Sequence, residues 1–133
     1  MTDQGAPGSH ILFQDVALPP ASTVLTFALF VGNRASAWVV PSPETLDFTG
    51  GPNQHVRIDL MDPAAPEDDV GAGVLQNIFL PQPGDPLVSG YQTMMVDLST
   101  FAGRTVRLRF AEVDNQNFLH MGVDNIQICT SGN

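Results

Sequence analysis

The sequence predicts an all-β fold, an antiparallel β-sandwich of the jelly-roll type, with residues 1–133 in a single domain. Three observations support this fold class. Several segments alternate apolar and polar residues with the period of a strand. Eleven prolines and twelve glycines separate these segments and leave little room for helices. A chain of 133 residues, 43% of them hydrophobic, can bury a core without disulfides. We expect residues 1–9 to form a flexible tail.

The first half of the chain contains four candidate strands, namely residues 11–18, 24–31, 37–40 and 55–61. The second of these is almost uniformly apolar, as in a strand that is covered on both faces. The fourth alternates, and its apolar face consists of Val56, Ile58 and Leu60. The opposite face consists of His55, Arg57 and Asp59.

The second half predicts three further strands, at residues 91–98, 104–110 and 118–128. Residues 70–79 predict a short helix that packs across one end of the sandwich. Residues 98–105 predict a turn, with one turn of helix, between two strands.

The tripeptide Val-Asp-Asn occurs twice, at residues 113–115 and 123–125. The alternation of residues 104–110, continued along the chain, directs Glu112 and Asp114 toward the core. In the last strand the alternation changes phase at Asp124-Asn125, which predicts a β-bulge there. Asp114-Asn115 is typical of the start of a hairpin loop.

The charge of the chain excludes some partners. Fourteen acidic residues and five basic ones, all arginine, give a net charge of −9. Nucleic acids and anionic membranes bind through clustered cations, so we expect neither as a partner. No apolar run approaches the roughly 20 residues of a membrane helix. The first ten residues lack the basic start and apolar run of a signal peptide.

Two segments carry a resemblance to a known group of proteins. "VDLSTFAGRTVRLRFAEVDN" followed by "MGVDNIQI" resembles the last strands of jelly-roll modules in secreted bacterial proteins, the galactose-binding-like, MAM-like and carbohydrate-binding modules. "GSHILFQDVAL" resembles an early strand of these modules, although the "GxFE"-like strand that usually begins them is missing. The resemblance implies a secreted or cell-surface location.

The resemblance also implies a structural calcium ion between the first and last strands. Asp124 would bind it together with Asp15, or with Gln14 beside it, because calcium prefers oxygen ligands. In the alternative interpretation, Asp124-Asn125 is only a bulge, satisfied by backbone amides.

Carbohydrate recognition needs an aromatic surface with planar polar groups beside it. Trp38 and Tyr91 are the only aromatic residues with a strong hydrogen-bonding group. A polar strip for sugar hydroxyls would consist of Arg57, Asp59, Arg107 and Arg109. These four residues also fit cross-strand ion pairs on a solvated face.

Three classes of function follow, and we rank them in this order. The first is a non-catalytic module that binds carbohydrate or another neutral extracellular polymer. The second is a self-assembling protein, since a sandwich without its first strand exposes an edge at residues 11–18 or 118–128 and favours a homodimer. The third is a small glycan hydrolase or lyase that uses Asp59 and Glu112 as acid and base. The sequence contains no catalytic triad or His-rich metal motif, so we expect a protein that is not an enzyme.

Overall fold

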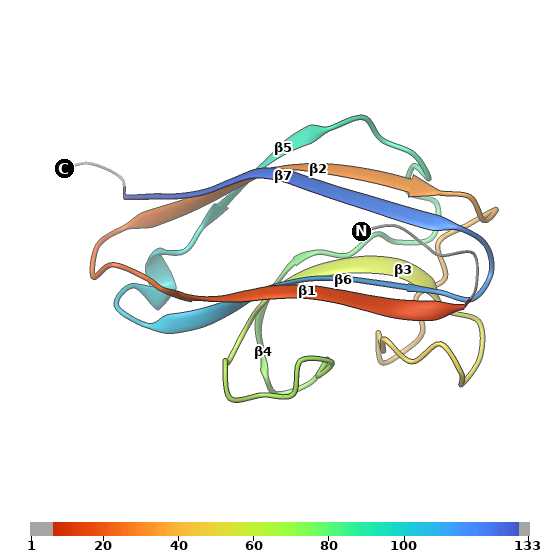
Figure 1. The fold of residues 1–133 in the computed structure, drawn as a ribbon, viewed down its shortest axis with the longest axis horizontal. Coiled ribbons are helices and arrows are strands. Elements are labelled where there is room, and N and C mark those ends of the chain that lie inside the picture. Colours follow the sequence, from red (N-terminus) through yellow and green to blue (C-terminus); the bar gives the residue numbers. More distant parts are fainter. Residues whose placement is uncertain (1–6, 131–133) are drawn as a thin grey trace.

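The protein is a sandwich of two antiparallel β-sheets. The computed structural model describes residues 7–130. The four-stranded sheet has the order β1-β6-β3-β4, and the three-stranded sheet has the order β5-β2-β7 (Figure 1). The strands are β1 (Gly8–Ala17), β2 (Thr23–Asn33), β3 (Gln54–Met61), β4 (Val74–Phe79), β5 (Gln92–Asp97), β6 (Thr105–Asp114) and β7 (Leu119–Thr130).

This architecture confirms the predicted all-β sandwich but not its jelly-roll topology. A jelly roll has eight strands in two Greek keys, whereas residues 7–130 form seven strands. The single-turn 3₁₀ helix η1 (Ser99–Phe101) lies where the sequence predicted a turn. Gly8 and Ser9, predicted to belong to a tail, are already part of β1. Residues 1–6 of that predicted tail lie outside the described residues.

The core lies between the two sheets and is built from the apolar face of each strand. Val56, Ile58 and Leu60 are buried, as their alternation predicted. The rings of Phe27 in β2 and Phe110 in β6 meet edge to face with centroids 5.7 Å apart, and they join the two layers.

Residues 70–79 do not form the predicted helix, because Val74–Phe79 form strand β4. Glycines at positions 71 and 73 weaken a helix, and the free edge of β3 offers hydrogen bonds to an extended chain. Residues 37–40 also differ from their prediction, since only Val39 makes a bridge, to Gln54.

The predicted β-bulge in the last strand is confirmed. The register of β2 with β7 shifts between Thr26 and Ala28, whose partners are Gln127 and Asp124. Two residues of β7 therefore stand opposite Phe27 alone. One of them, Asn125, has a φ of 54°, the left-handed conformation in which asparagine is enriched.

The outer faces of the two sheets differ. Two long loops, residues 41–53 and 62–73, lie against the outer side of the four-stranded sheet (Figure 1). The outer side of the three-stranded sheet presents exposed side chains such as Met95 and Tyr91. The polar face of β3 is consequently covered, and every residue of that strand is buried.

Candidate binding pocket

The carboxylate of Asp59 is the centre of a buried ionic network beneath the two loops. Its Oδ2 accepts hydrogen bonds from Arg57 Nε at 2.7 Å and from Arg109 Nη2 at 2.5 Å. Its Oδ1 accepts from Arg57 Nη2 at 3.0 Å and from Asn77 Nδ2 at 2.8 Å. Burial alone would raise the pKa of Asp59, but these hydrogen bonds outweigh it and hold the pKa below its usual value. The carboxylate is therefore ionised.

The two guanidinium groups connect this carboxylate to the two loops. Arg57 Nη1 donates to the carbonyl oxygen of Glu44 at 2.8 Å in the 41–53 loop. Arg109 Nη1 donates to the carbonyl oxygens of Glu67 and Asp69, at 2.9 and 2.6 Å, in the 62–73 loop. One buried carboxylate thus fixes both loops on the sheet through planar, multidentate donors.

Asn115, just after β6, holds the 41–53 loop from its other side. Its side-chain amide donates to the carbonyl oxygens of Phe48 and Gly51, at 3.0 and 2.6 Å, and its Oδ1 accepts from the backbone N–H of Asn53 at 2.7 Å. This agrees with the predicted role of Asp114-Asn115 at the start of the hairpin loop, because β6 ends at Asp114. The loop is therefore held at two independent points.

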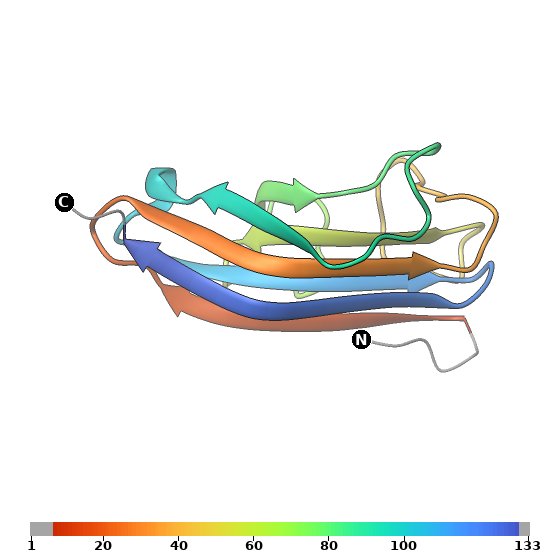
Figure 2. The same cartoon turned by 90° about the horizontal axis from the view of Figure 1, so that it is seen from above.

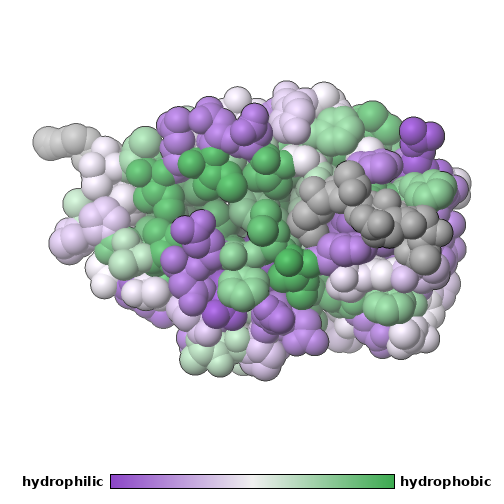
Figure 3. All heavy atoms as spheres, viewed as in Figure 1, coloured by the Kyte–Doolittle hydropathy of each residue, from purple (hydrophilic) through white to green (hydrophobic). Residues whose placement is uncertain are grey.

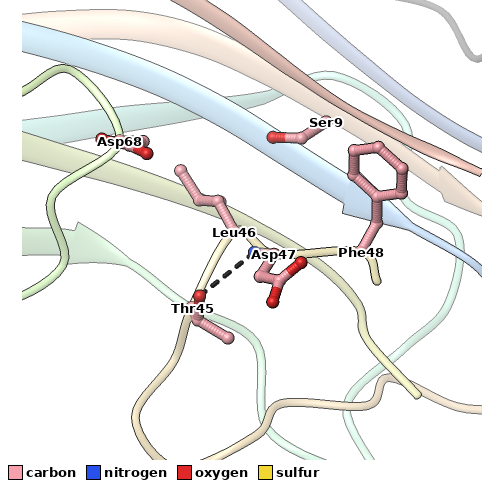
Figure 4. A pocket seen from close by; sticks show the side chains of 6 residues that line it. All are labelled: Ser9, Thr45, Leu46, Asp47, Phe48 and Asp68. Atoms are coloured by element: carbon pink, nitrogen blue, oxygen red, sulfur yellow. Dashed lines mark hydrogen bonds between the residues drawn. The ribbon is translucent and has the colours of Figure 1, made fainter. Parts of the chain in front are cut away.

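A pocket of about 350 Å³ opens between the two loops and the start of β1. Figure 4 shows its six lining residues: Ser9, Thr45, Leu46, Asp47, Phe48 and Asp68. In that view Phe48 and Asp68 lie on opposite sides, with Leu46 and Asp47 between them. The size falls within the usual range of ligand sites, roughly 300 to 1,000 Å³.

The lining of the pocket combines apolar surface with oxygen atoms and contains no cationic side chain. Asp47 Oδ1 accepts hydrogen bonds from the backbone and the hydroxyl of Thr49, at 2.8 and 2.6 Å. These bonds lower the pKa of Asp47. Asp47 is therefore an acceptor at neutral pH, beside the hydroxyl groups of Ser9 and Thr45.

The predicted polar strip is divided between two environments. Arg57, Asp59 and Arg109 are buried, so the expectation of an exposed strip is wrong for these three residues. The loops that cover them leave no surface at which a ligand would meet them. Arg107 alone reaches the outside, where it lies 4.3 Å from the ring centroid of Phe13.

Trp38 does not form the predicted platform at the surface. It is 2% exposed, belongs to the core, and donates from its indole N–H to the carbonyl oxygen of Pro86 at 3.1 Å. Its hydrogen-bonding group is therefore already satisfied by the protein.

Tyr91, by contrast, is 61% exposed on the outer face of the three-stranded sheet. Its ring lies against that of Phe30, with centroids 5.7 Å apart. A side chain at position 122 would collide with Tyr91, because its Cβ atom would lie 2.7 Å from the Tyr91 hydroxyl oxygen. Glycine at 122 therefore leaves room for the Tyr91 ring against the sheet.

The two predicted calcium ligands do not meet. Asp15 accepts hydrogen bonds from Arg107 Nε and Nη2, at 2.7 and 3.2 Å, on the outer face of the four-stranded sheet. Asp124 belongs to the other sheet, and its Oδ1 accepts from the N–H of Asn125 at 2.8 Å. Among residues 7–130, no group of three or more His, Cys, Asp or Glu side chains is placed to hold a metal ion. The geometry therefore favours the bulge interpretation of Asp124 over a calcium site shared with Asp15.

Asp59 and Glu112, the predicted acid and base, lie on opposite faces of the four-stranded sheet. Glu112 and Asp114 face the core, as predicted, and both are buried. His10 of the edge strand β1, whose side chain is 37% exposed, places its Nδ1 3.1 Å from Glu112 Oε1. Because the sheet separates Asp59 from Glu112, the two carboxyl groups do not flank one cleft.

Four of the six pocket residues, Thr45, Leu46, Asp47 and Phe48, come from the 41–53 loop, which the strand pattern of the sequence marks only as a break between strands. A signal for this loop did exist: in the Asp-Phe-Thr segment the Asp47 side chain accepts a hydrogen bond from the backbone N–H of Thr49, as in an Asx turn. Asp68 comes from the 62–73 loop, another segment between strands, and no motif in the sequence singles it out.

Comparisons with known proteins give no relative. No family model, no curated protein and no solved structure matches this chain. The likeness to secreted jelly-roll modules therefore rests on the quoted residues alone. In the described residues, no helix is long and apolar enough to span a membrane.

Proposed function

We propose that this protein is a non-catalytic module that binds a neutral carbohydrate, or a similar hydroxyl-rich polymer, in the pocket between the 41–53 and 62–73 loops. The observation that carries the proposal is the attachment of both loops to the single buried carboxylate of Asp59. Replacing the whole of such a network by well-packed apolar residues is often neutral for stability, so its presence favours a role beyond stability. A fixed pocket, however, lowers the entropic cost of binding.

The chemistry of the lining supports a neutral ligand with hydroxyl groups. Asp47 and Asp68 offer carboxylate oxygens to hydroxyl donors, and Ser9 and Thr45 offer hydroxyl groups. Phe48, 38% exposed, offers an aromatic face to the C–H groups of a sugar ring. The absence of a cation from the lining residues, together with the net charge of −9, disfavours phosphorylated or sulfated ligands.

A binding role is favoured over catalysis by the state of the Asp47 carboxyl group. A glycosidase needs one carboxyl group that stays protonated as the acid. The hydrogen bonds from Thr49 hold the pKa of Asp47 low, which suits a hydrogen-bond acceptor rather than an acid.

Affinity electrophoresis through gels that contain soluble neutral polysaccharides of several linkages tests the proposal. We expect at least one of them to retard the protein, and polyanionic polysaccharides not to do so. Phe48→Ala and Asp68→Asn should each weaken binding by about tenfold, the loss of roughly 1.4 kcal/mol of contact.

Tyr91→Ala is the matched control, because it removes an exposed aromatic ring from the opposite sheet. It should leave retardation unchanged. Loss of retardation in Tyr91→Ala but not in Phe48→Ala would move the site to the Tyr91–Phe30 surface. No retardation by any polysaccharide, or release of reducing ends, would contradict a non-catalytic carbohydrate module.

A further inference from the structure

The sandwich has four edge strands, and β1 is the least protected of them. Strands β4 and β5 have six residues each, and the register of β4 with β3 shifts twice. Strand β7 is interrupted by the bulge at Asn125. Strand β1 pairs with β6 over ten residues without a register shift, and it contains no lysine, proline or bulge. Natural proteins use short strands, bulges, lysine and proline to block pairing between sheet edges, and β1 has none of these protections.

The side of the molecule that carries β1 is also apolar. Strands β1 and β7 lie at this side in both ribbon views, and β1 is the outermost strand there (Figure 2). Apolar atoms gather between the two strands (Figure 3). Leu12 of β1 is 53% exposed and Ile126 of β7 is 45% exposed. Leu12 pairs with Phe110 of β6, whose side chain lies in the core, so Leu12 lies on the inner face of its sheet. Its side chain is exposed because β1 is the edge strand of that sheet.

We propose that two copies of this chain associate through β1, antiparallel about a two-fold axis at Leu12, so that the two four-stranded sheets form one continuous sheet of eight strands. An axis perpendicular to the sheet keeps the inner and outer faces of both copies aligned. Leu12 then faces Leu12 of the other copy, and Ile11 faces Phe13, which is 40% exposed. Each β1 edge supplies the backbone partners that the other lacks among residues 7–130 of its own chain.

The charge of β1 permits pairing with a second copy in this register. The only acidic residue of β1 is Asp15, and Arg107 neutralises it within the same molecule. In this register Asp15 faces Ser9 of the other copy, six residues along the strand from the other Asp15. That separation is roughly 20 Å, well beyond the Debye length of about 8 Å at physiological salt. The two copies therefore meet at a locally neutral strip, although each carries a net charge of −9.

Sedimentation velocity between about 1 and 200 µM tests the association. We expect a monomer–dimer equilibrium that shifts toward dimer as sodium chloride is raised, because salt screens the repulsion between two acidic molecules. Amide hydrogen exchange should slow in β1 as the dimer forms. A monomer throughout this range would overturn the proposal.

The register is tested with Leu12→Lys and Leu12→Glu. Each substitution places like charges directly opposite one another across the axis, so each variant alone should be monomeric. An equimolar mixture should regain association, because opposite charges then meet. Met95→Lys, on the exposed strand β5, is the matched control and should dimerise like the wild type. Dimers in either single variant, or a mixture that stays monomeric, would overturn pairing about Leu12. Carbohydrate binding is measured separately, so either proposal can fail alone.

Discussion

At the scale of single residues, His55 shows how a buried site responds to pH. Its Nδ1 lies 2.7 Å from Asn53 Oδ1, so Nδ1 carries the proton of the neutral ring. Its Nε2 is buried without a hydrogen-bond partner among the described residues. Burial, followed by the nearby charge of Arg57, lowers the pKa of His55 to about 4. Protonation would place a charge in this buried site, where the backbone of Val39 favours the charged ring but does not offset its burial.

We expect His55 to make the protein less stable in acid. The unfolded state, with a His55 pKa near 6.5, takes up a proton before the folded state does, so stability falls as pH is lowered from 6.5 toward about 4. At about 1.4 kcal/mol per pKa unit, the loss is about 3 kcal/mol. Urea unfolding at pH 7.5, 6, 5 and 4 measures it, with His55→Gln as the comparison. A wild type and a variant that lose stability in parallel would contradict this role. The pKa of Asp59 is held below its unfolded value of 3.8, so Asp59 lowers the stability of the fold only when the pH falls below about that value.

At the scale of elements, Arg107 and Arg109 of β6 should differ strongly although they look alike in sequence. Arg109 is buried against Asp59 and holds the 62–73 loop, whereas Arg107 pairs with Asp15 near the surface. Arg109→Met leaves a buried carboxylate with one guanidinium partner, so the free energy of unfolding should fall by about 3–5 kcal/mol. Arg107→Met should cost about 1 kcal/mol or less.

Chemical denaturation of both variants measures this difference, and limited proteolysis should cut the 62–73 loop sooner in Arg109→Met. Equal and small losses in the two variants would show that the ionic network does not hold the loop. Equal and large losses would show that the surface pair with Asp15 matters as much as the buried one.

The same arginines show what the sequence can and cannot predict. Alternation correctly assigns Val106, Leu108, Phe110 and Glu112 to one face of β6, and a change of phase correctly locates the bulge at Asn125. Alternation does not reveal whether the other face meets water. That depends on where two proline-rich loops fold, and these loops are fixed by contacts between residues far apart in the sequence, such as Arg109 and Asp69, which are 40 positions apart. The pocket was missed for this reason.

At the scale of the whole molecule, the sandwich presents three distinct surfaces. One outer face is covered by loops that enclose the pocket, and the other carries the Tyr91–Phe30 pair. The side between β1 and β7 carries a cluster of apolar residues (Figure 3), and among residues 7–130 no further strand pairs with either of these two edge strands. The four-stranded sheet has one strand more than the three-stranded sheet packed on it. Among the described residues no strand follows β7 at its free edge, so the inner face of β1 is left partly uncovered.

The net charge of −9 should make the stability of the whole fold depend on salt. Fourteen acidic residues against five arginines repel one another more in the compact state than in the unfolded chain. Sodium chloride screens this repulsion, so raising it from about 20 to about 500 mM should increase the free energy of unfolding by about 1 kcal/mol. The buried network around Asp59 is shielded from salt and should not oppose this change.

Urea unfolding at about 1 µM protein, where the proposed dimer is dissociated, measures the effect. Magnesium and calcium chloride at the same ionic strength are the controls. A decrease with salt would show that surface ion pairs outweigh the general repulsion, and a larger increase with calcium than with magnesium would reveal a bound calcium ion.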